Sequence, residues 1–285
     1  STSVTTTTTT VTKKHSTIAD IGCDHGLLSI ALAVSGRYDK VIGIDVSSRA
    51  LEDGALTFHR KVLDILGRDN YSNDNDNQQN GGGDGDGDCG PNNNDKKNIL
   101  FGSSILPLEF RLGDGLTPLR SGEADAICIA GMGVESMLSI LNLTNEEGDD
   151  SDDDCNKNHY LKNLNCQTLY LQPPKNRPKH LMALYKALQE NNEWLLIDER
   201  IVRVKKRWYV TCAFERVIEA DRHCIEDNSA RFRLPGHFLS TNSNDKEEFR
   251  RYMQHHLDWL SNDLKIKGHL SEEEMLWMNQ FKEVP

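Results

Sequence analysis

The stretch from Ile18 to Leu28, IADIGCDHGLL, constrains the fold of this chain more than any other. A short apolar run ends at Gly22, a polar turn follows, and helix-type spacing of apolar residues begins at Leu27. This order of strand, glycine turn and helix is typical of α/β folds that bind a nucleotide-type ligand beyond the strand's carboxyl end. About twenty residues later, Val41–Asp45 predicts a buried strand ending in a carboxylate, which is placed to accept both hydroxyls of a ribose. An adenosine-containing cofactor is therefore expected.

The residues inside the turn distinguish between two cofactors. Dinucleotide-binding turns usually read G-x-G-x-x-G, whereas residues 22–26 read GCDHG, with Cys23 and Asp24 in place of one glycine. An acidic turn repels a pyrophosphate but suits S-adenosylmethionine, which carries a sulfonium and an ammonium and no phosphate. The turn favours S-adenosylmethionine. An NAD(P)-type dinucleotide and a turn without a ligand in an ordinary α/β core remain alternatives at this point.

Two segments of the 285-residue chain are too polar to fold. Residues 67–98 and 144–158 are rich in Asn, Asp and Gly and almost free of apolar groups, so we expect disordered insertions at surface connections. The first carries a net charge of −4 and the second −6, which together account for nearly all of the formal net charge of −11. The remainder is close to neutral, so the acidic composition does not exclude an RNA substrate.

Basic residues cluster at two places outside these insertions. Such clusters beside a cleft are the electrostatic footprint of nucleic-acid binding. A solvated strand edge protected by lysines is an equally good interpretation of the second cluster alone. The expected RNA-binding residues are Lys175, Arg177, Lys179, Arg203, Lys205, Lys206 and Arg207, with Arg200 beside them.

The seven cysteines are odd in number and lack C-x-x-C spacing, which indicates free thiols in a reducing compartment. We expect an intracellular location, the cytoplasm or an organelle such as the plastid. Residues 1–17 are rich in Ser and Thr and contain no acid, so we expect a disordered leader, the remnant of a targeting segment. No metal site and no membrane-spanning segment are expected. A monomer is favoured.

The remaining pattern alternates strands and helices. Strands are predicted at 17–21, 40–45, 108–112, 125–130, 167–172, 194–204 and 207–216, and helices at 27–35, 48–64, 134–142 and 178–191. The first five strands are separated as parallel crossovers require, and the last two form an antiparallel hairpin. This predicts the Rossmann-like, seven-stranded sheet of a class I methyltransferase over residues 18–217. Residues 218–285 are expected to form a small helical appendage.

Three further motifs follow predicted strands. Arg111–Leu116 (RLGDGL) follows the third strand, where the carboxylate of Asp114 can hold an adenine amino group. Ala130–Gly133 (AGMG) follows the fourth strand, beside the expected methyl group and the incoming substrate. Leu171–Pro174 (LQPP) follows the fifth. Each motif is weak alone, but their order at successive strand ends is specific.

Together these motifs resemble the bacterial tRNA (adenine-N1)-methyltransferases of the TrmK type, which modify adenine 22. The resemblance covers roughly residues 18–217 and rests on DIGCDHG at 20–26, GDGL at 113–116, IAGMG at 129–133, LQP at 171–173 and the hairpin from Glu199 to Tyr209. It implies S-adenosylmethionine as cofactor and tRNA as substrate. By that resemblance the cofactor is bound by Asp20, Gly22, Gly26, Asp45 and Asp114, and the methyl-transfer site is lined by Gly131, Met132 and Gly133.

The expected chemistry needs little base catalysis, because adenine N1 carries a free lone pair at neutral pH. The protein must flip the base from its stack and orient N1 toward the methyl group. A carboxylate near the amino group can stabilise the cationic product or take its proton. We assign this role to Asp24, with His25 as its neighbour or orienting group. The alternative is that Asp24 caps the following helix.

The substrate class has alternatives as well. The Asn-Pro-Pro-Tyr motif of enzymes that methylate exocyclic amino groups is absent after the fourth strand, which favours a ring nitrogen. A methyltransferase acting on another RNA, a small molecule or a protein, and a non-catalytic RNA-binding scaffold with this fold, remain as competing hypotheses.

Overall fold

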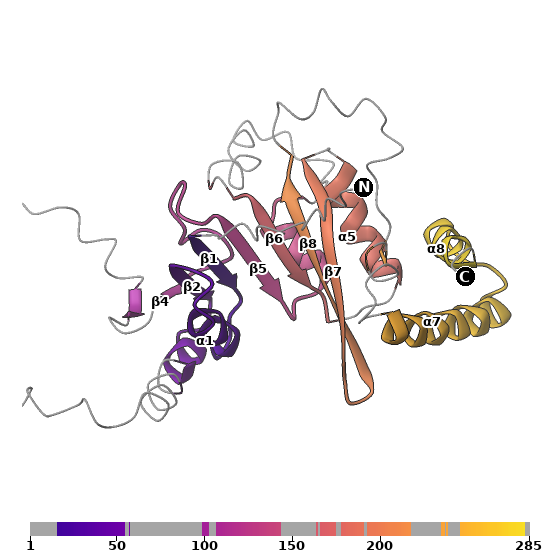
Figure 1. The fold of residues 1–285 in the computed structure, drawn as a ribbon, viewed down its shortest axis with the longest axis horizontal. Coiled ribbons are helices and arrows are strands. Elements are labelled where there is room, and N and C mark those ends of the chain that lie inside the picture. Colours follow the sequence, from indigo (N-terminus) through magenta and orange to yellow (C-terminus); the bar gives the residue numbers. More distant parts are fainter. Residues whose placement is uncertain are drawn as a thin grey trace, which may run out of the picture.

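The computed structural model describes residues 16–54, 57, 99–102, 107–143, 164, 166–174, 178–190, 193–217, 235–236, 238 and 246–282. Their centre is an eight-stranded sheet with the order β3-β4-β2-β1-β5-β6-β8-β7 (Figure 1). The strands are β1 (Thr17–Ile21), β2 (Lys40–Asp45), β3 (Ile99–Gly102), β4 (Leu108–Leu112), β5 (Ala126–Ala130), β6 (Thr168–Gln172), β7 (Trp194–Val204) and β8 (Arg207–Arg216). The labelled helices are α1 (Leu27–Val34), α3 (Val134–Ile140), α5 (Pro178–Glu190), α7 (Lys246–Lys267) and α8 (Glu272–Lys282).

The topology confirms the predicted fold. β4, β2, β1, β5 and β6 run parallel to one another, whereas β8 is antiparallel to both β6 and β7. The chain therefore reaches the edge of the sheet at β7 and returns inside it as β8. The short connection of two residues, Lys205 and Lys206, leaves no length for a parallel crossover.

The eighth strand, β3, was not predicted. It pairs antiparallel with β4 at the free edge of the sheet, and its register shifts between Ile99 and Phe101. A four-residue edge strand has one neighbour only and little room for an alternating pattern, so the sequence carries no clear signal for it. Of the helix predicted at 48–64, residues 48–54 and 57 are helical, and the other residues of that range lie outside the described part of the chain. The expected leader, apart from its last two residues, and both acidic insertions lie outside the described residues.

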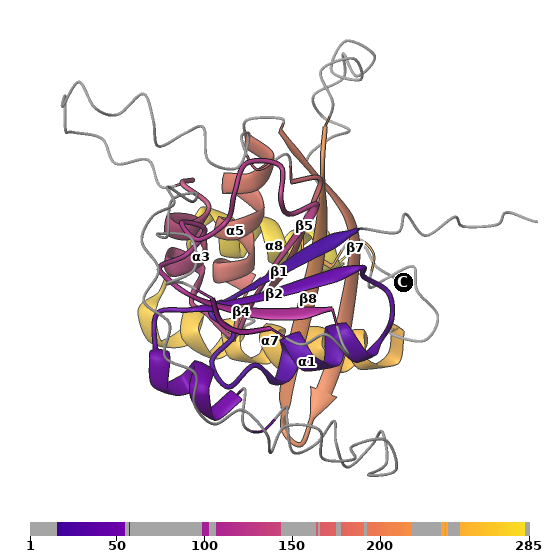
Figure 2. The same ribbon diagram turned by 90° about the vertical axis from the view of Figure 1, so that its left-hand side faces the viewer.

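Alternate residues of the central strands serve two separate cores. Ile18 and Val41 join the core on the face covered by α1, with Phe110 of β4. Ile21 and Ile44 join the larger core on the opposite face, with residues of α3 and α5 (Figure 2). Because strand residues point alternately to the two faces, each continuous apolar run of these strands supplies both cores at once.

The helix α7 belongs to the larger core. Its apolar stripe of Phe249, Tyr252, Met253 and Leu260 is almost fully buried and packs with the core that includes α5 and β7. The stripe is thus used for packing, as its helical period indicates. None of the helices in the described part of the chain is both long and apolar enough to cross a membrane.

Candidate active site

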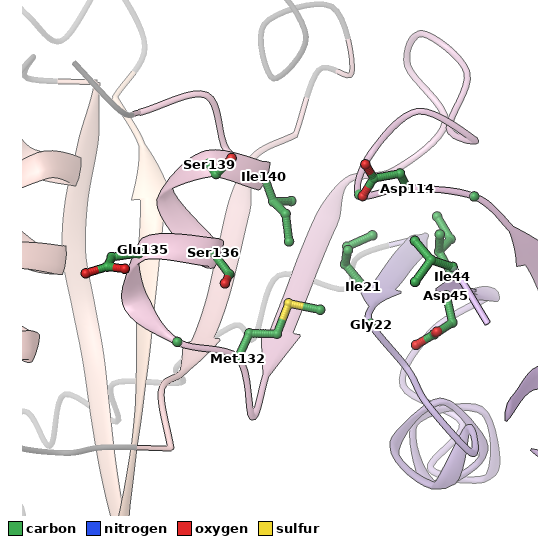
Figure 3. A pocket seen from close by; sticks show the side chains of 14 residues that line it. Ile21, Gly22, Ile44, Asp45, Asp114, Met132, Glu135, Ser136, Ser139 and Ile140 are labelled. Carbon is green, nitrogen blue, oxygen red and sulfur yellow. The ribbon is translucent and has the colours of Figure 1, made fainter. Parts of the chain in front are cut away.

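A cleft of about 630 Å³ opens where β1, β2, β4 and β5 end (Figure 3). Its volume lies within the range of sites for small ligands and cofactors. Four strand ends and the first turns of α3 enclose it, so segments far apart in the sequence meet there. It is lined by Ile21, Gly22, Ile44, Asp45, Val46, Gly113, Asp114, Gly115, Met132, Gly133, Glu135, Ser136, Ser139 and Ile140.

The glycine turn after β1 forms one wall of the cleft. Gly22 has a φ of +68°, and the amides of Gly22 and Cys23 donate to the Ile44 carbonyl at 2.8 and 3.0 Å. A side chain at Gly22 would overlap the terminal methyl group of Met132, whose side chain points across the cleft toward Gly22 in Figure 3. Glycine is therefore favoured by the backbone conformation, and any larger side chain would also displace the flexible end of Met132.

Asp45 connects the second strand to this turn. Its Oδ2 accepts a hydrogen bond from the Asp24 amide at 2.8 Å, and its Oδ1 accepts one from the Ser47 amide at 2.9 Å. A carboxylate has about four acceptor positions, so two remain for a ligand. This arrangement leaves Asp45 able to bind two hydroxyls in the cleft.

The charge of the cleft has one sign. Among the residues that the structure describes, its lining contains the carboxylates of Asp45, Asp114 and Glu135 and no Lys, Arg or His. Figure 3 shows Asp45 and Asp114 on one side of the cleft and Glu135 on the far side of α3, directed away from them. A cationic ligand is favoured by such a lining, whereas a pyrophosphate meets no counter-charge there.

The loop that carries Asp114 is held from behind by Arg111. The Arg111 guanidinium is buried, donates to the Pro118 carbonyl at 2.9 Å and makes two hydrogen bonds of 2.6 and 2.7 Å to Glu123. The Gly113 amide donates to the Asp45 carbonyl at 3.0 Å. Arg111 thus supports the Asp114 loop and has no place in the cleft.

Three of the predicted cofactor residues do not line the cleft. Asp20 is buried and accepts a hydrogen bond from the Ser29 hydroxyl at 2.6 Å, and burial raises its pKa to about 6. Gly26 starts α1 and packs against the ring of Phe110. Gly131 has a φ of +79° and donates its amide to the Gln172 carbonyl. These three shape the turns around the cleft, and a direct contact with the cofactor stays a prediction for them.

Asp24 and His25 lie on the exposed side of the glycine turn. Their side chains are 74% and 55% exposed, with Asp24 Oδ1 3.8 Å from His25 Nε2. Asp24 has a φ of +51°, a conformation that Asp adopts more readily than most residues. The alternative role of Asp24 as a helix cap is wrong, because the N-cap is Gly26 and α1 has no side-chain capping hydrogen bond. The Asp24 carboxylate is therefore not engaged by the helix.

The residues of α3 that line the cleft were missed in the sequence. Glu135, Ser136, Ser139 and Ile140 follow the AGMG turn directly, and the spacing of three and four residues from Ser136 places them on neighbouring positions of one helix side. That spacing after Gly133 was the signal in the sequence by which these cleft residues could have been found.

Of the predicted RNA-binding residues, Lys175 and Arg177 lie outside the described residues, and so does the side chain of Lys179. Arg203, Lys205, Lys206 and Arg207 are exposed at the turn between β7 and β8.

A family model described as "Methyltransferase domain" matches residues 3–64 and 84–211. Together these stretches make up well over half of the chain. They contain all four strand ends of the cleft and the glycine turn. No curated protein matches the chain.

Solved structures give the same fold. A Streptococcus pneumoniae protein described as a candidate tRNA (m1A22) methyltransferase is 17% identical, with 96% of this chain and 94% of that chain covered and a TM-score of 0.53. M. capricolum TrmK with S-adenosyl-homocysteine is 15% identical, with 94% and 90% covered and a TM-score of 0.51. A Streptococcus agalactiae protein of the NADB-Rossmann superfamily is 20% identical, with 95% and 87% covered and a TM-score of 0.51. At these identities the likeness establishes the fold.

Proposed function

Because the chain belongs to the methyltransferase domain family, we propose that it transfers a methyl group from S-adenosylmethionine to N1 of an adenine in tRNA. The observation that carries the proposal is the cleft at the strand ends, whose described lining residues include three carboxylates and no Lys, Arg or His. Two structural neighbours are described as tRNA (m1A22) methyltransferases or as TrmK, which supports the choice of substrate.

The residues present fit the cofactor by their chemistry. Asp45 keeps acceptor positions for the two ribose hydroxyls, and Asp114 supplies an acceptor for the adenine amino group. Ile21, Ile44 and Ile140 offer apolar surface in the same cleft for the adenine ring. When bound, the cofactor supplies an electrophilic methyl group. The protein then has to orient the acceptor nitrogen and to stabilise the charge that develops on the methylated base.

We assign the second task to Asp24. Its backbone is fixed by Asp45, whereas its carboxylate is exposed and has the His25 ring as its neighbour. N1-methyladenine is cationic unless its amino group loses a proton, so a carboxylate near that group stabilises the product or accepts the proton. Met132, which lies in the cleft against Gly22, supplies apolar surface where the base and the methyl group meet.

The test is direct. The purified chain is incubated with unmodified tRNA and labelled S-adenosylmethionine, and the nucleosides are then identified by mass spectrometry. We expect 1-methyladenosine in the presence of the cofactor, and its loss when adenine 22 of the tRNA is replaced by guanine. Label in N6-methyladenosine or in protein overturns the choice of substrate. Weak or absent binding of S-adenosylmethionine in calorimetry, together with no methyl transfer, identifies a non-catalytic scaffold.

A further inference from the structure

The hairpin of β7 and β8 extends beyond the carboxyl ends of the parallel strands, on the side of the sheet where the cleft lies. Ala130 of β5 is in register with Gln172, the last residue of β6. The β6–β8 and β7–β8 ladders align Leu171 with Cys212 and Glu199, so one further residue along the strands places Gln172 level with Arg200 on β7. Residues 201–210 lie beyond that level. At about 3.3 Å per residue, four paired residues in each strand project roughly 13 Å past the sheet. We call residues 200–211 the arm; it is the long loop of β7 and β8 in Figure 1.

One face of the arm is used for packing. The Arg203 guanidinium lies 5.0 Å from the centre of the Trp208 ring, and the His255 ring of α7 lies 5.1 Å from it. The Trp208 Nε1 donates to Glu248 of α7 at 3.1 Å. This face therefore fixes the arm to α7. Arg203, predicted to bind RNA, is engaged there by a cation–π contact.

The opposite face has a different composition. Strand alternation and the register place Val202 opposite Tyr209 and Val204 opposite Arg207 on this face. Val202 and Val204 are 57% and 51% exposed, and Tyr209 is half-buried with no hydrogen-bond partner for its hydroxyl among the described residues. We call this set, with Arg200, the outer face.

The arm is uniformly basic. The sequence from Arg200 to Phe214 contains five Lys or Arg residues and no acid. Lys205, Lys206 and Arg207 form no ion pair within the described part of the chain. Arg200 pairs with Asp198 at 3.0 Å, but both side chains are exposed. Arg200 can therefore exchange Asp198 for another anion at little cost in free energy. A half-buried aromatic ring beside two exposed aliphatic side chains, with unpaired cations at the end of the arm, matches the two components of RNA, bases and phosphates.

We propose that the outer face of the arm binds unpaired nucleotides of the tRNA that flank the target adenine. This inference rests on the proposed function and specifies its substrate contact. Tyr209 and the two valines offer surface on which bases stack, and Arg207 with Lys205 and Lys206 binds the backbone phosphates. A base has to leave its stack to reach the cleft, so its neighbours become unpaired and available to this surface.

The position of the arm supports this assignment. Gly131, which directly follows Ala130, donates its amide to the carbonyl of Gln172, and that residue is level with Arg200 through the ladder. Three strand spacings of about 4.8 Å separate β5 from β7, so the start of the arm lies roughly 15 Å from the AGMG turn. That distance is short enough for the outer face and the cleft to contact one RNA loop. Lysines that merely protect a strand edge require neither Tyr209 nor the exposed valines.

The test compares Tyr209→Ala, Tyr209→Phe and Arg207→Gln in the full chain, with Lys265→Gln in the last turn of α7 as the matched control. We expect Tyr209→Ala to raise KM for tRNA about tenfold, with kcat at saturating tRNA and the affinity for S-adenosylmethionine unchanged. Tyr209→Phe keeps the ring and should restore KM. Arg207→Gln should weaken tRNA binding and lower the slope of log K against log salt by about one, whereas Lys265→Gln changes neither.

The outcomes separate this inference from the proposed function. If the wild-type chain transfers no methyl group to tRNA, the proposed function fails. If it does so and Tyr209→Ala and Arg207→Gln leave KM and the salt slope at wild-type values, the outer face alone is refuted. A wild-type dimer in sedimentation that Val202→Lys dissociates, with KM unchanged, identifies a second copy of the chain as the occupant and also overturns the proposal. Thermal melts confirm that each variant is folded.

Discussion

The carboxylate of Asp45, at the end of β2, holds the backbone of Asp24 in the turn after β1, with 2.8 Å between the carboxylate oxygen and the amide nitrogen. One residue thus connects the expected ribose site to the residue expected to meet the substrate base. The other carboxylate oxygen accepts the Ser47 amide, which fixes the direction of the side chain. Binding of the cofactor at Asp45 and placement of Asp24 are therefore physically linked.

Asp45→Asn should lose cofactor affinity. An amide side chain has one acceptor oxygen, so it cannot accept both backbone amides and also bind ribose hydroxyls. Leaving one amide without a partner costs about 1–2 kcal/mol, and we expect affinity for S-adenosylmethionine in calorimetry to fall at least tenfold. Asp53→Asn removes an exposed carboxylate from the neighbouring helical segment and serves as the control. Equal affinities for both variants contradict a role of Asp45 in binding.

Asp24→Asn should separate catalysis from binding. Asn tolerates the φ of +51° as well as Asp does, so the turn and the Asp45 hydrogen bond remain. If the carboxylate takes the proton or stabilises the cationic base, kcat for tRNA methylation should fall about 100-fold while cofactor affinity stays within twofold. Single-turnover kinetics and calorimetry measure the two quantities. An unchanged kcat removes Asp24 from the mechanism.

Gly26→Ala should destabilise the protein more than Gly22→Ala. Both glycines have φ near +67° (66° and 68°), so the backbone strain of about 1–2 kcal/mol is shared. An added Cβ at Gly26 lies 2.6 Å from ring atoms of Phe110, which is fully buried and cannot move, whereas at Gly22 it meets the flexible end of Met132. We expect Gly26→Ala to lower the free energy of unfolding in urea by about 3 kcal/mol or more. Equal losses for the two variants contradict this explanation.

Asp20 should make the free energy of unfolding depend on pH. Burial raises its pKa to about 6 in the folded state, above its ordinary value of 3.8, so the folded protein binds more protons between these values. Stability from this group is thus present below about pH 4 and is lost as pH rises through about 6, by roughly 3 kcal/mol. Asp20→Asn, which can still accept the Ser29 hydrogen bond, should be more stable than wild type at neutral pH and equal to it near pH 4. Urea titrations at both pH values test this.

Glu123 should have the opposite pH dependence. Burial alone raises its pKa, but the hydrogen bonds from Arg111 outweigh this and hold it at about 2, below its ordinary value of 4.5. Its contribution is therefore present above about pH 4.5 and disappears as pH falls toward 2. Glu123→Gln leaves the buried Arg111 charge without its bidentate partner and should cost about 3 kcal/mol at neutral pH. A Glu123→Gln variant as stable as wild type in urea at neutral pH overturns this role.

The glycine turn, the central strands and the terminal hairpin could be predicted from the sequence because they depend on local chemistry. Gly22 needs a positive φ, the apolar runs of β1 and β2 must be buried on both faces, and the two-residue connection at Lys205 and Lys206 forces a hairpin. The residues at strand ends followed from this, since parallel strands bring their carboxyl ends to one edge. Asp45, Asp114 and Met132 were found in this way.

Other positions depended on which way a side chain points within the assembled sheet. Asp20 lies two residues from Gly22, yet it points to the face of α1 and bonds to Ser29, so it does not enter the cleft. Arg203 and Arg207 look alike in the sequence, but one packs on Trp208 against α7 and the other is exposed on the opposite face of the arm. The cleft residues of α3 also depend on the assembled sheet, whereas β3 was missed because a four-residue edge strand carries little pattern.

The sequence by itself determined the class of sheet, the glycine turn and the acidic character of the expected cofactor site, because these arise from backbone conformation, burial and residue type along short segments. Only the tertiary structure decided that Asp45 holds Asp24, that Arg111 supports the Asp114 loop at the Pro118 carbonyl, and that the arm has one packed and one open face. Those relationships join residues through the register and pleat of neighbouring strands. A shift of one residue in the register between two strands moves a side chain to the opposite face of the sheet, and the amino-acid composition does not indicate which register forms.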